Sequence, residues 1–174
     1  LFDLAEEAKA HVLDFAATNG IEIDFRPGHL NVTHKKRELP EYETYVEALN
    51  RFGYPHATMM DAAETAQRVG SDHYCGGVRD AGTGHIHPLK FLVGLAKAAA
   101  AAGARLCENT KVTKLGTAGG KVIAETSTGT ITANKALLAV NAYGHDVEPV
   151  SAAHIMPIGS FIGATEPLPD NSPV

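Results

Sequence analysis

The sequence lacks the features of several protein classes, and these absences narrow its function. No segment approaches the ~18 consecutive apolar residues that a membrane-spanning helix requires, and the N-terminus has no basic stretch followed by an apolar one, as a signal peptide would. Lysine and arginine are scattered along a chain of net charge −5, so no basic stripe is available to follow a nucleic-acid backbone. We therefore expect a soluble, cytoplasmic protein that binds neither membranes nor nucleic acids.

Motifs for metal and nucleophile chemistry are also missing. The two cysteines, Cys75 and Cys107, have no CxxC spacing, which disfavours a zinc or redox dithiol site and predicts two buried free thiols. The sequence has no HExxH motif, and Ser160 lacks the second glycine of a nucleophile elbow. Hydrolysis is therefore the least favoured of the chemistries considered.

The glycine-rich segment YCGGVRDAGTGHIHPLKF, residues 74–91, does not form a phosphate-binding motif. Gly82 and Gly84 have the spacing of a dinucleotide fingerprint, but His87 stands where the third glycine would fall. The GTAGG segment at 116–120 connects two strand-like stretches and begins no helix. Neither segment therefore predicts a Walker or dinucleotide loop.

Two histidines in the same segment leave a choice between a metal site and a structural joint. His85 and His87 would share one face of an extended segment, and His73, His29 or His154 would have to complete a metal-binding set. The residue before a proline is restricted to extended geometry, so His87 is suited to leading the chain into a helix at Pro88. The structural joint is favoured, and we expect no metal.

Residues 1–80 have the patterns of a mixed α and β structure. Apolar positions at helical spacing and turn residues predict, in order, a helix over 1–18, an antiparallel pair of strands at 21–25 and 30–32 joined by a turn at 26–28, and helices over 40–52 and 61–69. Asp61 is suited to capping the last helix, with Glu64 at the capping-box position.

The rest of the chain has an α/β pattern. Pro88 begins a predicted helix over 88–102, apolar on nearly every side and therefore expected to be buried or packed tightly on a sheet, and Gly103 ends it. Strands are predicted at 104–108, 112–115, 121–126, 130–133 and 136–140. The last of these is wholly apolar, as in a central strand covered on both faces, and the crevice beyond such a strand is where nucleotide-like ligands bind in open α/β sheets.

Several segments together resemble a known enzyme family. They are IDFRPGHLNV (23–32), GSDHYCGGVRDAGTGHIHPLKF (70–91), AAGARLCENTKVTKL (101–115), ITANKALLAVNAYG (131–144) and IMPIGSFIGATEPL (155–168). They resemble the middle of FAD-dependent amine oxidases of the D-amino-acid oxidase type, in particular gamma-glutamylputrescine oxidoreductase-like flavoenzymes. The family's opening GxGxxG unit and its C-terminal part are absent, and the chain begins at Leu1 within a helix, so we expect a central fragment.

The resemblance implies a division into domain portions. Residues 1–84 would form part of an antiparallel-sheet substrate domain, 85–154 part of a Rossmann-like FAD-binding domain, and 155–174 the start of a second crossing to the substrate domain. This gives a mixed α/β and α+β fold.

The resemblance also implies a cofactor site and a reaction. Val140, Asn141, Ala142 and Tyr143 would line the FAD, and Val112 would face its adenine end; the family often has glycine in place of Asn141. The complete enzyme would oxidise the C–N bond of a small amine or amino acid.

No residue is identified as a catalytic base, although Arg26 or Arg79 could pair with a substrate carboxylate. The alternative is a free-standing module that binds a small ligand without catalysis.

Overall fold

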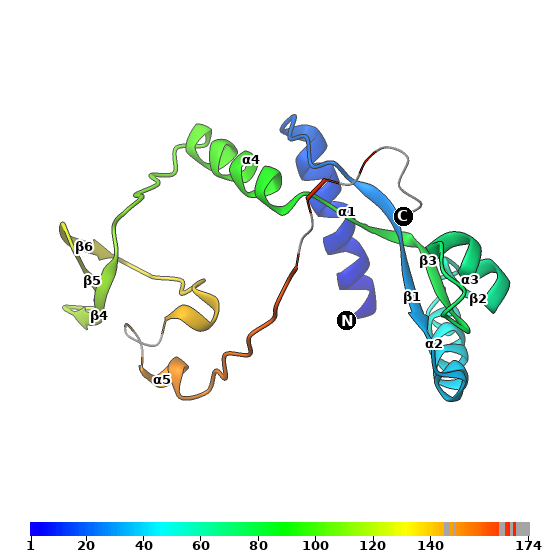
Figure 1. The fold of residues 1–174 in the computed structure, drawn as a ribbon. Coiled ribbons are helices and arrows are strands. Elements are labelled where there is room, and N and C mark those ends of the chain that lie inside the picture. The colour runs from blue at the N-terminus through cyan, green and yellow to red at the C-terminus, as the bar shows by residue number, and fades with distance from the viewer. Residues whose placement is uncertain (145–146, 148, 164–165, 168, 170–174) are drawn as a thin grey trace. The chain divides into compact units, whose positions relative to one another are not determined.

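The computed structural model describes residues 1–144, 147, 149–163, 166–167 and 169. The chain divides into two compact units, residues 1–104 and 105–167, whose helices and strands are labelled in Figure 1. The expected boundary between residues 84 and 85 lies within the first unit, near the end of its last strand. The assignment of chain portions to a substrate domain and an FAD domain stays a prediction.

The first unit alternates helices with the strands of one sheet. Its elements are α1 (Phe2–Thr18), β1 (Arg26–Thr33), η1 (Lys36–Glu38), α2 (Leu39–Arg51), β2 (Ala57–Met60), α3 (Ala62–Val69), β3 (Gly76–His85) and α4 (Pro88–Ala101). The four α-helices confirm the predicted helices to within about one residue. Asp61 Oδ1 accepts a hydrogen bond from the Glu64 N–H at 2.8 Å, as expected of the N-cap, whereas the Glu64 carboxylate pairs with Arg68.

The strands of this unit form an antiparallel sheet in the order β1-β3-β2, with β3 in the centre. Because side chains alternate between the faces of a strand, Val78 and Arg79 of β3 lie on opposite faces. Val78 belongs to a buried cluster with Val46 and Tyr54, against which Phe2 of α1 packs. One face of the sheet is therefore covered by α2, and Phe2 brings the start of α1 against the same cluster.

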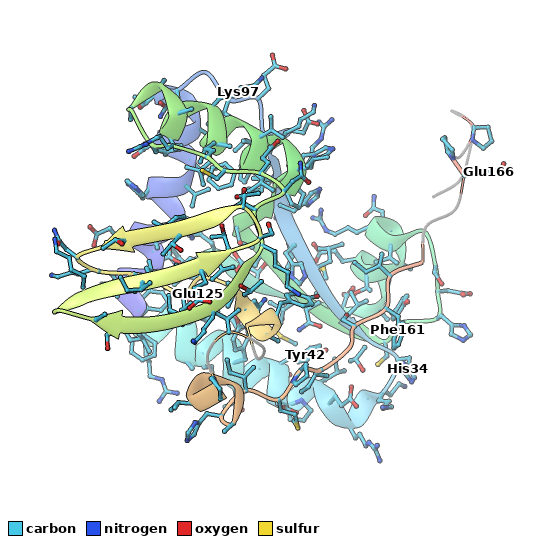
Figure 2. All side chains as sticks on the ribbon, turned by 90° about the vertical axis from the view of Figure 1, so that its left-hand side faces the viewer. His34, Tyr42, Lys97, Glu125, Phe161 and Glu166 are labelled. Atoms are coloured by element: carbon cyan, nitrogen blue, oxygen red, sulfur yellow. The ribbon has the colours of Figure 1, made fainter. Side chains whose placement is uncertain are left out.

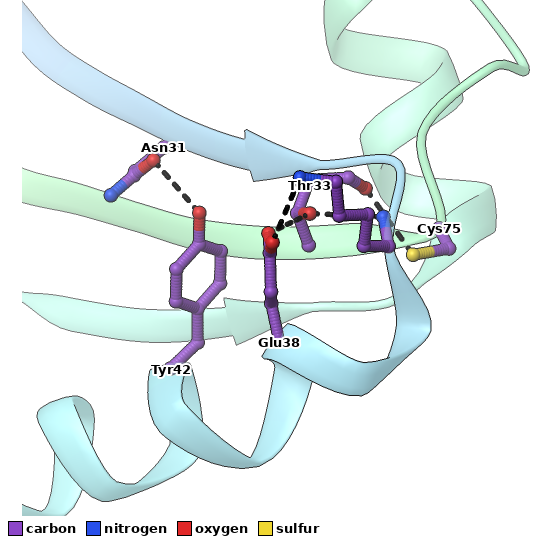
Figure 3. Close-up of polar contacts among 6 residues, drawn as sticks. Asn31, Thr33, Glu38, Tyr42 and Cys75 are labelled. Carbon is purple, nitrogen blue, oxygen red and sulfur yellow. Dashed lines mark hydrogen bonds and ion pairs between the residues drawn. The ribbon is translucent and has the colours of Figure 1, made fainter.

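A set of polar contacts holds the end of β1 to the start of α2 (Figure 3). The buried Thr33 hydroxyl donates to Glu38 Oε2 at 2.6 Å, and the Lys35 ammonium lies 3.3 Å from Glu38 Oε1. Tyr42 donates its hydroxyl to Asn31 Oδ1 at 3.1 Å. These contacts close the short turn between β1 and α2. They therefore allow α2 to pack back against the sheet to which β1 belongs.

The predicted hairpin at the start of this unit is wrong. Residues 21–25 form no strand, and the segment 26–28, predicted as a turn, is the beginning of β1. β1 pairs with β3 instead, and an irregularity between Pro27 and His29 accommodates the proline and Gly28 within the strand. Pairing with a segment some fifty residues away has no local signal, and β2 was missed for the same reason.

The second unit contains a meander of three antiparallel strands, β4 (Val112–Ala118), β5 (Lys121–Thr126) and β6 (Gly129–Ala133). It confirms the predicted hairpin over 121–133 and the strand beginning at Val112. Figure 2 shows the side chains of this sheet, with Glu125 on β5; its carboxylate lies 3.5 Å from the Lys114 ammonium. The short turns η2 (Asn141–Tyr143) and α5 (Pro149–Ala152) follow.

Two predicted strands of this unit do not form. Residues 104–108 and 136–140 have no regular secondary structure, and Leu137 is 92% exposed. An apolar run becomes a central strand only when neighbouring strands pair with it, and among the described residues none does so for 136–140. Parts of the expected second crossing, residues 164–165, 168 and 170–174, lie outside the described residues.

Two further predictions about burial are also wrong. Cys75 is half-buried, with its thiol donating to the Thr33 carbonyl, and Cys107 is exposed. α4 has no buried residue and exposes Leu89, Leu92 and Val93, although it approaches the chain closely at Gly94. A Cβ at Gly94 would lie 2.3 Å from Ile21 Cγ2, so the helix packs closely against the segment that follows α1 and, within the described chain, not on a sheet.

Candidate functional sites

The residues predicted to line FAD form a tight turn. The Tyr143 N–H donates to the Val140 carbonyl at 3.0 Å, which closes the turn at η2. Val140 is 44% and Tyr143 85% exposed, so both side chains lie at the surface of the described part of the second unit. The turn thus offers apolar and aromatic surface beside accessible backbone.

Asn141 has an uncommon backbone conformation for a residue other than glycine. Asn141 has a φ of +50°, in the left-handed region. Glycine enters that region without steric cost, and asparagine enters it more readily than most other residues. Asn141 and glycine can therefore support the same turn, and the conformation is one that permits close approach of backbone to a ligand.

Val112 belongs to a different element from this turn. It is the first residue of β4, half-buried, and pairs with Thr126 of β5. No hydrogen bond joins Val112 to the Asn141 turn within the described part of the chain. The assignment of the turn to FAD, and of Val112 to the same site, stays a prediction.

The histidines of segment 74–91 have structural contacts. The His87 N–H donates to the Ile23 carbonyl at 2.7 Å, and His87 Nδ1 accepts from the Lys90 N–H at 3.4 Å. His87 is the N-cap of α4, which begins at Pro88. This confirms the structural joint. Among the described residues no group of three or more His, Cys, Asp or Glu side chains is arranged to hold a metal ion.

The glycines of the same segment are explained by close packing. Gly82 lies beneath the Tyr54 hydroxyl and the His56 ring, where an added Cβ would stand 2.6 Å and 2.7 Å from their nearest atoms. At Gly84 a Cβ would be 2.4 Å from the Arg26 carbonyl oxygen. Both glycines belong to β3, so their small size allows neighbouring groups to approach the strand.

A buried tyrosine and a carboxylate form a polar pair at this point. Tyr54 donates its hydroxyl to Asp80 Oδ1 at 2.7 Å, and Asp80 Oδ1 also accepts from the Gly82 N–H at 2.9 Å. Burial, together with the hydrogen bond to Asp80, raises the pKa of Tyr54 well above its usual range. Tyr54 therefore serves as a neutral hydrogen-bond donor that orients Asp80 toward the covered face of the sheet.

The two arginines considered for a substrate carboxylate occupy different environments. Arg26 is exposed at the start of β1 and lines a smaller cleft with the carboxylate-bearing Asp24. Arg79 is half-buried in the centre of the sheet and lines a cleft with Arg68 and His29. The sequence analysis did not identify Arg68 or connect it with Arg79, because α3 and β3 come together only through tertiary packing.

No helix in the described part of the chain is long and apolar enough to cross a membrane.

The family model for FAD dependent oxidoreductases (DAO) matches residues 1–174, the whole of the chain. The chain is 55% identical over 169 residues to the protein named Probable oxidoreductase OrdL of Rhizobium meliloti (strain 1021), covering 97% of this chain and 40% of that protein.

More distant similarities agree with this match. Gamma-glutamylputrescine oxidoreductase of Escherichia coli (strain K12) is 36% identical over 152 residues, which cover 87% of this chain and 35% of that protein. The fold is similar to the crystal structure of glycine oxidase from Bacillus cereus ATCC 14579, with a TM-score of 0.76 at 21% identity. That alignment covers 87% of this chain and 44% of the glycine oxidase chain.

Proposed function

The chain belongs to the family of FAD dependent oxidoreductases, and from this premise we propose that it is the central part of an enzyme that oxidises the C–N bond of a small amine or amino acid. The family match over every residue of the chain carries the proposal. The name of the Escherichia coli relative, which is 36% identical, supports an amine as the substrate class. The 40% coverage of the Rhizobium relative supports a larger active protein.

We assign the Asn141 turn to the cofactor. Val140, Asn141, Ala142 and Tyr143 would hold FAD through exposed backbone and apolar side chains, and Val112 would lie toward the adenine. FAD, when bound, would supply the electron acceptor for oxidising the amine to an imine, which water then hydrolyses. The left-handed conformation of Asn141 supports this assignment because such conformations are used where the backbone approaches a ligand closely.

The exposed apolar residues support the proposal that further protein covers both units in the complete enzyme. Leu89 and Leu92 of α4 are 62% and 60% exposed, and Leu137, in the run expected as a central strand, is 92% exposed. Apolar surface of this kind is stabilised by burial, at about 25 cal/mol per Å². The segments that complete the FAD domain would provide that cover.

The first test concerns Asn141 in the protein made from the complete reading frame. Asn141→Gly should retain FAD through purification, because glycine adopts the same positive φ. Asn141→Val should lose it, because a β-branched residue is strained there by roughly 1–3 kcal/mol. Flavin absorbance per protein and the circular dichroism spectrum of each variant are the measurements. Equal FAD content in both variants, with both folded, would contradict the assignment.

The second test concerns the reaction itself. Anaerobic mixing of the flavin-loaded protein with gamma-glutamylputrescine, putrescine or glycine should bleach the flavin with at least one amine or amino acid. No bleaching across a broad amine and amino-acid panel would exclude the proposed substrate class. A start codon directly before Leu1 with no upstream GxGxxG segment would instead favour the free-standing binding module.

A further inference from the structure

A cleft of about 610 Å³ opens on the face of the first sheet opposite the Val78 cluster. Residues 27–30 of β1 form one side, Gln67 and Arg68 of α3 form another, and Arg79 of β3 completes the lining. Small-molecule sites in proteins typically enclose roughly 300–1,000 Å³, so the cleft has a suitable size. All of its lining belongs to one compact unit.

The charges in this cleft are positive and incompletely paired. Arg79 is half-buried, and its guanidinium has no hydrogen bond or ion pair with any described residue. Arg68 uses its Nε to contact Glu64 Oε1 at 2.9 Å, an interaction along α3 itself. Asp80, the acid next to Arg79 in sequence, faces the other side of the sheet, where Tyr54 and the Gly82 N–H hold it. The lining itself contains no acidic residue.

Two guanidinium groups line this cleft, the half-buried one of Arg79 and the exposed one of Arg68 at its rim. Like charges that lie close together repel one another, and an anion bound between them converts that repulsion into attraction. Guanidinium presents a planar fork of N–H donors that matches both oxygens of a carboxylate or two oxygens of a phosphate. The Gln67 amide and the backbone at Gly28 add neutral polar groups.

We infer that the cleft lined by Arg68 and Arg79 binds the oxyanion group, carboxylate or phosphate, of a small molecule. Arg79 is the central ligand because it stands on the middle strand with no partner for its guanidinium. Arg68 flanks it from α3. This site is in the first unit and is independent of FAD binding by the Asn141 turn.

The test is a titration of the isotope-labelled 174-residue chain with glutarate and, separately, with inorganic phosphate, followed by amide NMR at constant ionic strength. Saturable shifts should be confined to residues 28–30, 67–68 and 79. Arg79→Gln should weaken the affinity by roughly tenfold to a hundredfold, the loss expected for a charge-assisted hydrogen-bonded pair. The tighter of the two probes identifies whether the group is a carboxylate or a phosphate.

Arg26→Gln is the matched control, because it removes the same charge from an exposed position on β1 outside the cleft, and its affinity should equal that of the unaltered chain. Arg79→Lys keeps the charge but not the fork and should bind with intermediate affinity. An unchanged amide spectrum outside the cleft shows that a variant is folded. Absence of saturable shifts with both probes, or equal weakening by Arg26→Gln and Arg79→Gln, would overturn the inference.

Discussion

At the scale of single residues, several side chains have roles that depend on one or two contacts. Asn141 matters through its backbone angle, Gly82 through the space it leaves for Tyr54, and His87 through its cap on α4. The role of His87 was predicted from the sequence, because it depends on the neighbouring Pro88. Contacts between residues distant in sequence, such as Tyr54 with Asp80, have no local signal.

Glu38 makes the stability of the first unit depend on pH. The hydrogen bond from Thr33, supported by Lys35, lowers the pKa of Glu38 below its ordinary value of 4.5. A lowered folded-state pKa contributes stability that is present above the ordinary value and is lost as the pH falls through the lowered one. Glu38→Gln should therefore unfold at lower urea concentration than the unaltered chain at pH 7, and the difference should disappear in acid.

The control for this prediction is Glu43→Gln, since Glu43 is exposed on α2 and its carboxylate has no hydrogen bond or ion pair with a described residue. Its urea midpoint should follow that of the unaltered chain at every pH. A Glu38→Gln difference that stays constant from pH 7 into acid would show that the carboxylate charge is not involved.

At the scale of elements, the pairing of β1 with β3 determines the first sheet. Val32 stands opposite Gly77, and here the strands approach so closely that a Cβ on Gly77 would lie 2.2 Å from the Asn31 carbonyl oxygen. Backbone atoms cannot move aside as a flexible side chain would. The predicted hairpin at 21–32 was wrong because the alternation of apolar and polar residues identifies extended segments but not the strands with which they pair.

Gly77→Ala should destabilise the first unit by about 1–3 kcal/mol or more, the usual cost of forcing extra atoms into a packed region. Gly116→Ala in β4 is the matched control, because nothing lies within 4 Å of its added Cβ. Urea unfolding followed by circular dichroism gives both values. Equal free energies of unfolding for the two variants would show that β1 and β3 accommodate the Cβ added at Gly77 without loss of stability.

At the scale of the whole molecule, burial is unevenly distributed. All buried apolar residues of the described chain belong to the first unit; they are Ala16, Ile23, Val46, Tyr54, Ala57, Met60 and Val78. The meander β4-β5-β6 has hydrogen-bonded strands but no buried residue. Three strands need a covered apolar face for independent stability, so the second unit is expected to open more readily.

Native-state amide hydrogen exchange measures this difference directly. Amides of β3 should exchange at least tenfold more slowly than those of β5, because opening the first sheet exposes the Val78 cluster whereas opening the meander exposes little new apolar surface. Protection of β5 equal to that of β3 would show that the second unit has a stabilising cover of its own.

The sequence alone determined the helices, the hairpin over 121–133, the joint at His87 and Pro88, and the family, because these depend on local periodicity, caps and motif residues. Only the tertiary structure decided that β1 pairs with β3, that 136–140 forms no strand in the described chain, and that Arg68 and Arg79 share a cleft. Strand partners and convergent side chains depend on contacts between segments far apart in the sequence. The energy of such contacts comes from burial and pairing, which no single segment specifies by itself.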